Sequence, residues 1–579
     1  IAAVTTVSAF VHESLIRPLP FRNTQELVML WTSIPSQKIE QDGSAYPTIQ
    51  DWRKRNLSFI DLALVSRAEA GTLFDAGEPE QIRIARVSAN LFPLLGVTPL
   101  LGRTFSPLEE EQREPLAVLS YAFWQSRFNG SPQAIGQTIR TGDGRLQVIG
   151  VMAPDFRFPS KDIQIWEPHT LPPYWPQLKY NRGSDIYKVV GRLRPHVTWR
   201  DAEASMNVLA RQIADEQAAI PRGLGVKAIP LFEQLTGRTI PLALSLLFAA
   251  VVGILLIACA NVAGLLLARG LAREREFAIR TTIGAGRMRL IQQLLIESLV
   301  LALISGVMGI AAGGVAIRLL QANLPLDVPH ISTIGMSVSV AVFSFGLSLL
   351  TVVVCGILPA LRLSAVSPGG ALKGAAAARR LSHSAMRRTL VVSELAVATA
   401  LVIGTGLLVR SFINVQQTDP GFETDRVLAV RVTLPESYND VRQAAYFKEA
   451  MERLRALPGV TAAGAIHELF FEYNPDTVIA IEGRPPSRPD EPAPQLIGDA
   501  VTGDYFQVMG VPLLQGRLLS SRDTADAPPV AVINETMART FFPGDRAVGK
   551  RFTFGAPGPK SRWITIVGVV GDMHRQGLE

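Results

Sequence analysis

The sequence predicts a multi-pass α-helical membrane protein that carries two α+β extracytoplasmic domains. Three observations predict this fold: uncharged runs that could cross a bilayer, arginines gathered on one side of those runs, and two long polar segments that resemble each other. Only 18% of the 579 residues are charged and 48% are hydrophobic, whereas soluble domains usually have about a quarter charged residues. This composition excludes a disordered chain and disfavours a fully soluble enzyme. The net charge of +7 is expected in cytoplasmic loops rather than on a nucleic-acid-binding surface.

Four runs are long enough to cross a bilayer, which requires about 20 apolar residues. They span residues 240–268, 290–317, 338–361 and 390–410. The first and third runs carry no charged residue, the second contains Glu297, and the fourth contains Glu394 and ends at Arg410. Residues 1–11 are apolar or small and are interpreted as the end of a truncated first transmembrane helix. Because residue 1 is Ile and the sequence stops after a strand-like run, we expect further protein on both sides.

The charges of the connecting loops indicate which side of the membrane each loop faces. Loop 269–289 has six arginines against two glutamates, and linker 362–389 has six basic residues and no acid. Loop 318–337 has a single basic residue, at the helix end. Since basic loops stay in the cytoplasm, the first two are predicted to be cytoplasmic and the third to be a short external loop. Alternation then makes segments 12–239 and 411–579 folded external domains, since both are too long and too polar to be loops.

The two external segments contain the same series of short motifs, displaced by about 414 residues. The matched stretches are 87–97 with 501–511, 102–103 with 516–517, 117–120 with 531–534, 134–136 with 547–549 and 148–151 with 566–569. Five matches in one order indicate a duplication. In each copy we expect a short helix that ends at a glycine, Gly96 or Gly510. We also expect a strand followed by a helix capped by Ser120 or Asn534, which makes each copy an α+β domain.

Further motifs resemble those of a known family. They are RPLPF at 17–21, ACANVA at 258–263, REREFAIR at 273–280, RTLVVSE at 388–394 and DPGF at 419–422. Together with the duplication, they resemble the MacB-type periplasmic core domain joined to an FtsX-like ABC transporter permease, in the tandem-duplicated subgroup often found in acidobacteria. The resemblance covers essentially the whole chain. It implies that 12–239 and 411–579 are MacB-like periplasmic core domains, the second truncated, in a multi-pass protein of the bacterial inner membrane.

The resemblance also implies a function. The chain would be the permease subunit of an ABC-type transporter, which transmits ATP-driven motion from a cytoplasmic ABC ATPase subunit to the periplasmic domains for export or envelope remodelling. The alternative is a non-transport membrane scaffold that recruits or activates an envelope partner such as a cell-wall hydrolase. Besides the lipid bilayer, a periplasmic adaptor or envelope protein and a second copy of the chain, as a homodimer, are candidate partners. No cofactor and no nucleic acid are expected.

Loop 269–289 is the segment most suggestive of a binding role. Its candidate residues have near-helical spacing and are Arg273, Arg275, Glu276, Phe277, Ile279, Arg280 and Gly284. A short amphipathic helix here would present Phe277 and Ile279 to a partner and end at Gly284. The family resemblance implies that this helix couples the permease to the ATPase. The alternative is that the arginines only anchor the topology against anionic lipid.

Motifs for catalysis are incomplete, so the chain is predicted not to be an enzyme. Residues 544–551 resemble the phosphate-binding pattern G-x-x-x-x-G-K, but Arg551 replaces the Ser or Thr whose hydroxyl holds magnesium. Since no other ATPase motif occurs, energy is expected from a separate ATP-binding subunit. The only cysteines, Cys259 and Cys355, lie in apolar runs, which excludes a disulfide framework and a cysteine-based zinc site. The seven histidines do not cluster.

Polar and small residues inside the apolar runs are expected to organise helix packing. Asn261 is expected to form a hydrogen bond between helices. Glu297 and Glu394 are expected to serve packing or to pair with nearby arginines, and a proton or substrate role is the alternative. Close helix contacts are expected at Gly306, Gly309, Gly313 and Gly314.

Overall fold

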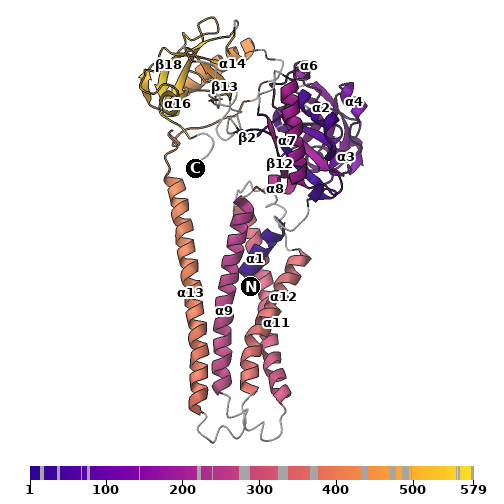
Figure 1. Cartoon of the computed structure of the whole chain (residues 1–579), viewed down its shortest axis with the longest axis vertical. Coiled ribbons are helices and arrows are strands. Elements are labelled where there is room, and N and C mark those ends of the chain that lie inside the picture. The colour runs from indigo at the N-terminus through magenta and orange to yellow at the C-terminus, as the bar shows by residue number, and fades with distance from the viewer. Residues whose placement is uncertain are drawn as a thin grey trace. The chain divides into compact units, whose positions relative to one another are not determined.

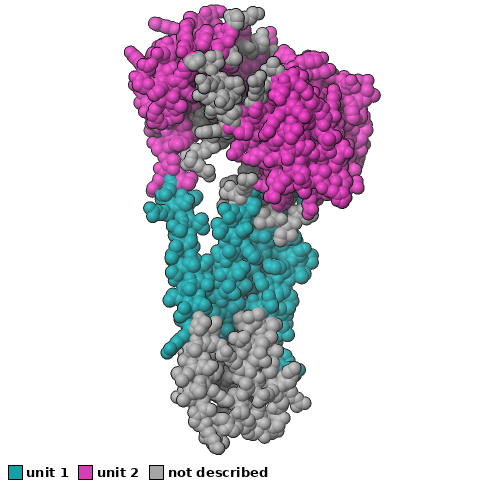
Figure 2. Space-filling model, viewed as in Figure 1, with its two compact units in different colours: residues 1–19, 235–414 teal, residues 20–234, 415–579 magenta. Residues whose placement is uncertain are grey.

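The computed structural model of the chain describes residues from both the apolar and the polar segments. The described ranges are 1–13, 19–35, 39–66, 68–74, 79–142, 144–217, 223–237, 239–272, 287–323, 337–364, 376–432, 434, 438, 440–467, 477–484, 495–496, 498–555, 557–558 and 561–574. The chain divides into two compact units (Figure 2). The helical unit comprises residues 1–19 and 235–414. The lobed unit comprises a first lobe, residues 20–234, and a second lobe, residues 415–579.

Long helices build the described part of the helical unit. They are α1 Ala2–Val11, α9 Thr239–Ala272, α11 Arg287–Asn323, α12 Val338–Ser364 and α13 Ala376–Gln417 (Figure 1). Windows long and apolar enough to cross a membrane are Pro241–Leu265, Leu303–Leu320 and Val391–Gln417, and shorter apolar stretches are Ala2–Val11 and Val338–Thr351. The four runs singled out in the sequence therefore lie within α9, α11, α12 and α13.

The first lobe contains an open antiparallel sheet. Its strands are β1 Leu27–Ile34, β3 Phe59–Ser66, β11 Tyr187–Leu193 and β12 Gly225–Pro230, in the order β3-β11-β1-β12, with β2 Ile39–Asp42 beside β1. Helices α2 Tyr46–Arg55 and α7 Trp199–Glu216 contribute to its core. Helix α7 buries Ala202, Met206, Leu209 and Ile213 at the spacing of one helix face. This periodicity explains why α7 packs on the sheet.

The other strands of the first lobe close into a ring. They are β4 Glu69–Leu73, β5 Glu80–Val87, β7 Leu116–Leu119, β8 Thr138–Thr141, β9 Gly144–Val151 and β10 Ile165–Pro168. Their order is β10-β7-β9-β8-β4-β5, and β10 pairs again with β5. Closure removes open strand edges. The ring joins the open sheet where Val65 of β3 pairs with Val87 of β5, so two cores share one continuous sheet.

The second lobe repeats the strand order of the ring. Its strands are β13 Thr477–Ile481, β14 Gln495–Leu496, β15 Leu513–Gly516, β16 Val530–Asn534, β17 Arg551–Phe554 and β18 Ile564–Val570, and helix α14 Asp440–Arg455 precedes them. The order β14-β13-β17-β18 matches β5-β4-β8-β9, and β16 lies beside β18 as β7 lies beside β9. Both parallel pairs shift register at the same place, after Ala117 and after Ala531. This shared irregularity confirms the duplication.

The predicted helix ends are also confirmed in both copies. Helix α3 Leu91–Leu95 is followed by Gly96 with φ of 71°, and α15 Tyr505–Val508 is followed two residues later by Gly510 with φ of 64°. In both copies the amide after the glycine donates to a carbonyl five residues earlier, which closes the helix end. Ser120 accepts from an amide of α5 Tyr121–Phe128, and Asn534 accepts from an amide of α16 Glu535–Phe541.

A second glycine of the repeat permits a close backbone approach. Gly102, in the short strand β6 Leu101–Gly102, has φ of 69°, and a Cβ there would lie 2.1 Å from the carbonyl oxygen of Ile149. Its counterpart Gly516 has φ of 77° and would bring a Cβ within 2.2 Å of the carbonyl oxygen of Val567. Only glycine satisfies both the positive φ and the contact, so the motif is retained in each copy.

Replacing Gly102 by Ala should therefore destabilise the first lobe more than replacing Gly136. Gly136 also has a positive φ, 87°, but a Cβ there would meet nothing within 4 Å. We expect a loss of about 1 to 2 kcal/mol in the free energy of unfolding for Gly136→Ala, and a further loss of about 1 to 3 kcal/mol for Gly102→Ala. Urea unfolding followed by tryptophan fluorescence measures both, because six of the seven tryptophans lie in this lobe. Equal losses would contradict the proposed role of the backbone contact.

Candidate functional site

The predicted coupling residues lie outside the residues that the structure describes. They are Arg273, Arg275, Glu276, Phe277, Ile279, Arg280 and Gly284. Helix α9 ends at Ala272 and α11 begins at Arg287, so the candidate loop connects the ends of two long helices. The role of these residues therefore stays a prediction, and the described helices supply the geometry around it.

Helix α1 packs closely on α11 through two glycines. A Cβ at Gly309 would lie 2.4 Å from Cγ2 of Ile1, and a Cβ at Gly313 would lie 2.9 Å from Cβ of Thr5. Val4 and Thr5 are buried in this contact region of α1. The expectation that these glycines permit close helix packing is confirmed. A contact this close leaves little room for α1 to slide past α11.

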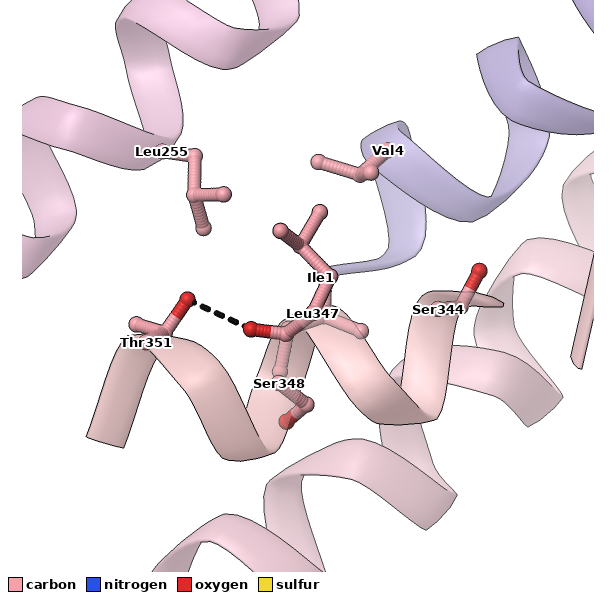
Figure 3. A pocket seen from close by; sticks show the side chains of 7 residues that line it. All are labelled: Ile1, Val4, Leu255, Ser344, Leu347, Ser348 and Thr351. Carbon is pink, nitrogen blue, oxygen red and sulfur yellow. Dashed lines mark hydrogen bonds between the residues drawn. The ribbon is translucent and has the colours of Figure 1, made fainter. Parts of the chain in front are cut away.

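A small pocket lies where α1 meets α9 and α12 (Figure 3). Its lining residues are Ile1, Val4, Leu255, Ser344, Leu347, Ser348 and Thr351. Ser344 is 2% exposed, and its hydroxyl has no hydrogen-bond partner among the described residues. The hydroxyl of Thr351 donates to the carbonyl of Leu347 at 2.8 Å. The space holds about one water molecule, which is far smaller than a substrate pocket.

A polar pair links α9 to α13. The side-chain amide of Asn261 donates to Oε1 of Glu394 at 2.7 Å. The expected hydrogen bond of Asn261 between helices is thus confirmed, and Glu394 is its acceptor. Eight residues earlier in α9, a Cβ at Gly253 would lie 3.3 Å from Cγ1 of Val397, which marks a second point of contact between the two helices. The side chain of Glu297 lies outside the described residues.

The segment that resembles a phosphate-binding loop has the wrong structural context. It follows helix α16 and leads into strand β17, whereas a nucleotide-binding loop follows a strand and opens a helix. Nζ of Lys550 lies 3.3 Å from the carboxylate of Asp545. Arg551, at the start of β17, pairs with Glu482. These residues therefore close a surface turn and do not present amides to a phosphate.

Each lobe carries the same arginine–carboxylate pair next to its close backbone contact. Arg103 binds both carboxylate oxygens of Glu109 at 2.8 and 2.6 Å, and Arg517 binds both oxygens of Asp523 at 2.7 Å. The hydrogen bonds from Arg103 hold the pKa of Glu109 at about 2. Those from Arg517 likewise lower the pKa of Asp523. Both pairs therefore remain charged at neutral pH and stabilise the loop that follows each glycine.

The sequence analysis missed a buried charged network in the first lobe. Nε of Arg86 donates to Oε1 of Glu167 at 2.7 Å, and Nη1 of Arg86 donates to the hydroxyl of Tyr174 at 2.9 Å. The side chains of Arg86 and Glu167 are only 5% and 1% exposed, and Arg86 also pairs with Glu69. The network lies on β5 and β10, next to the junction of the two cores.

Aromatic side chains extend this network around a buried histidine. Nε2 of His169 lies 3.1 Å from Oε1 of Glu110, and the ring packs against Tyr46 and Trp175 at centroid distances of 5.5 and 4.7 Å. Burial raises the pKa of the neighbouring Tyr187, which keeps that hydroxyl neutral. In the sequence, the only signs of this network are an arginine in strand β5 and a glutamate in the apolar run of β10. Because these residues are 81 positions apart, the sequence alone does not show that they pair.

The described residues contain no group of three or more His, Cys, Asp or Glu side chains that could hold a metal ion. The features that the fold brings together in the described residues are close helix contacts, a polar link between helices, and arginine–carboxylate pairs that hold a loop in each lobe. Two known domain families match the parts of the chain that carry these features. The MacB-like periplasmic core domain family matches residues 1–209 and 389–578, and the FtsX-like permease C-terminal family matches residues 248–368.

The chain belongs to the MacB/FtsX-like permease family. The core-domain family matches more than half of the chain, in two segments that flank the permease helices. The expected family, its α+β core domains and its multi-pass membrane class are therefore confirmed. The two matched segments also coincide with the two copies of the duplication.

Curated relatives share this assignment at low identity. Macrolide export ATP-binding/permease proteins MacB from Salmonella paratyphi A and Neisseria gonorrhoeae are each 24% identical, over 288 and 285 residues, which are 49% and 48% of this chain and 42% of each relative. MacB 2 of Aeromonas hydrophila is 24% identical over 349 residues, 56% of this chain and 49% of that protein. The chain thus spans just under half the length of these relatives.

Two solved structures are also similar to part of the chain. The periplasmic region of MacB from Actinobacillus actinomycetemcomitans has 12% identity and a TM-score of 0.29, and the match covers 37% of this chain and 94% of that one. A domain of a permease protein from Porphyromonas gingivalis has 14% identity and a TM-score of 0.29, with 36% and 91% covered.

Replacing Arg86 by Ala should lower the free energy of unfolding of the first lobe by about 3 to 5 kcal/mol, because Glu167 would be left buried without its partner. Arg83→Ala is the matched control. Nε of Arg83 lies 2.9 Å from Asp162, and these side chains are 38% and 44% exposed, so the loss should be about 1 kcal/mol or less. Urea unfolding followed by tryptophan fluorescence compares the two variants. Similar losses would show that burial does not strengthen the Arg86 pair.

Proposed function

We propose that the chain is the permease subunit of an ABC-type transporter and transmits ATP-driven motion from a separate cytoplasmic ATPase to its two lobes, for export or envelope remodelling. The observation that carries this proposal is the family match, in which core domains flank permease helices within one chain. The relatives are named as ATP-binding and permease proteins. In this chain, the family matches cover the permease region, and the only near-match to a nucleotide-binding loop has the wrong structural context.

The connections between helices and lobes support a mechanical role. Helix α8 Leu231–Thr236 directly follows strand β12, and α9 begins three residues after α8 ends. Gln234 of α8 accepts a hydrogen bond of 3.0 Å from the indole of Trp31 in β1. A displacement at the cytoplasmic end of α9 would therefore be carried along a continuous helix of about 50 Å. It would reach α8, which the Trp31–Gln234 hydrogen bond holds to the sheet of the first lobe.

Helix α13 leads into the second lobe through a similarly fastened segment. Gly421, just beyond the helix end, has φ of 77°, and a Cβ there would lie 2.1 Å from the carbonyl oxygen of Asp572. The amide of His574 donates to the carbonyl of Pro420 at 2.9 Å. The segment after α13 is therefore held against the end of strand β18. Movement of α13 would therefore be transmitted to the second lobe, because the segment that joins them is held in place and is not a flexible linker.

Replacing both Phe277 and Ile279 by Asp should abolish stimulation of the ATPase, because two charges would replace the apolar surface proposed to contact it. The ATPase is first captured with the full-length protein from membranes and identified by mass spectrometry. ATP hydrolysis by the captured ATPase is then measured with each permease variant in lipid. Thr281→Asp with Thr282→Asp is the matched control, since it adds the same charge to the same loop. Stimulation that persists in the Phe277 and Ile279 variant would refute this coupling site.

The two-sided layout required by this function can be tested in intact cells. Cys259 and Cys355 are first replaced by Ser, and single cysteines are then introduced by Ala376→Cys or Ala527→Cys. An impermeant thiol reagent, applied to cells whose outer membrane has been permeabilised, should label the Ala527→Cys variant and spare the Ala376→Cys variant. The opposite pattern would reverse the orientation and exclude a cytoplasmic coupling loop. Labelling of both after the inner membrane is opened is the control for reactivity.

A further inference from the structure

Helices α1 and α13 occupy equivalent positions in the duplicated chain. The core-domain family matches begin at residues 1 and 389, so each copy opens with one of these helices. Helix α1 belongs to the first half and packs on α9 of that half, where Val4, Val7 and Val251 form one buried cluster. Helix α13 belongs to the second half, yet its described contacts with Asn261 and Gly253 are also to α9.

Helix α9 meets these two helices on opposite faces. Successive residues of an α-helix are rotated by about 100°, so Val251 and Gly253 point about 160° apart around the helix. Phe248, Val251 and Leu255 form the face near α1. Gly253 marks the other face, where a Cβ would lie 3.3 Å from Cγ1 of Val397 and 3.4 Å from Cδ1 of Leu401. At the level of Gly253, helix α9 therefore lies between the equivalent helices of the two halves.

The two contacts between α9 and α13 agree on an antiparallel register. Moving from Asn261 back to Gly253 along α9 corresponds to moving forward from Glu394 to the region of Val397 and Leu401 along α13. Asn261 lies eight residues before Arg269, and Glu394 lies six residues after Arg388. At 1.5 Å per residue, Asn261 lies about 12 Å from Arg269 and Glu394 about 9 Å from Arg388, measured along each helix. The pair thus joins residues at matching depth.

We infer that this contact between α9 and α13 is the joint between the two halves of the duplicated chain, so that the halves pair within a single chain and the Asn261–Glu394 bond sets their register. In lipid there is no hydrophobic drive between helices, and small residues and polar bonds hold them together. Elsewhere α13 exposes large apolar side chains, such as Leu395 at 66% and Val402 at 71%. The joint therefore depends on the few residues that make the contact. This inference concerns pairing and holds whether or not an ATPase is the partner.

Cysteine cross-linking in the full-length chain tests the joint. Cys259 and Cys355 are replaced by Ser, a protease site is inserted after Gly370, and Gly253→Cys is combined with Val397→Cys. After oxidation and cleavage, the two pieces should migrate together at the mass of one uncleaved chain and separate on reduction. The control combines Val251→Cys with Val397→Cys, which lie on opposite sides of α9, and should not cross-link. Absence of the Gly253 cross-link, or a product of twice the chain mass, would overturn the inference.

Substitutions of the polar pair provide a second readout. Asn261→Leu should slow formation of the Gly253–Val397 disulfide about threefold, the effect of losing one hydrogen bond between membrane helices. Glu394→Gln keeps a carbonyl oxygen that can accept from Asn261, so its rate should match the parent. Equal rates for all three proteins would refute the assigned role of the bond. If Gly253→Cys prevents membrane insertion, the combination Asn261→Cys with Glu394→Cys tests the same contact, and its failure to cross-link would overturn the inference.

Discussion

A backbone in hydrocarbon must satisfy its own hydrogen bonds, and this constraint organises the whole chain. Helices meet the requirement within one segment, so the apolar runs fold as α9, α11, α12 and α13. Irregular loops, open strand edges and buried ion pairs then belong to segments outside the hydrocarbon, where water or protein can satisfy their polar groups. Within the helical unit, specificity depends on a small set of features, namely glycines that permit close approach and the Asn261–Glu394 bond.

The two lobes show which features of the repeat are structural and which are particular to one copy. The left-handed glycines, the helix caps and the arginine–carboxylate pair occur in both lobes, because the same backbone path requires them. The buried Arg86 has no equivalent, since Ala500 stands at the matching position. Its ion pair with Glu167 lies next to the junction between the two cores of the first lobe. Because the pair is buried, breaking it would leave an uncompensated charge and would cost much free energy. This favours a rigid junction in the first lobe.

The candidate site was only partly accessible to sequence reasoning. Asn261 was identified because an amide in an apolar helix needs a partner, and the structure supplies Glu394. The glycines of α11 were identified by the same logic, although their partners on α1 were not. The loop from Arg273 to Gly284 was singled out by charge and by family resemblance. Its residues lie outside the described part of the structure, so their coupling role rests on the proposed experiments.

Composition, periodicity and internal repetition by themselves determined the membrane class, the duplication and the helix caps, while the family entered only through short motifs that resemble it. Each of these signals acts over a few turns of chain or recurs at a constant displacement, so it can be recognised without coordinates. Tertiary structure alone decided the pairing of Arg86 with Glu167, 81 residues apart, and of Asn261 with Glu394, 133 residues apart. The physical reason is that a charge in a protein core, or an amide in an apolar helix, requires a hydrogen-bond partner. The residue type alone shows this requirement, whereas the fold decides which distant residue supplies the partner.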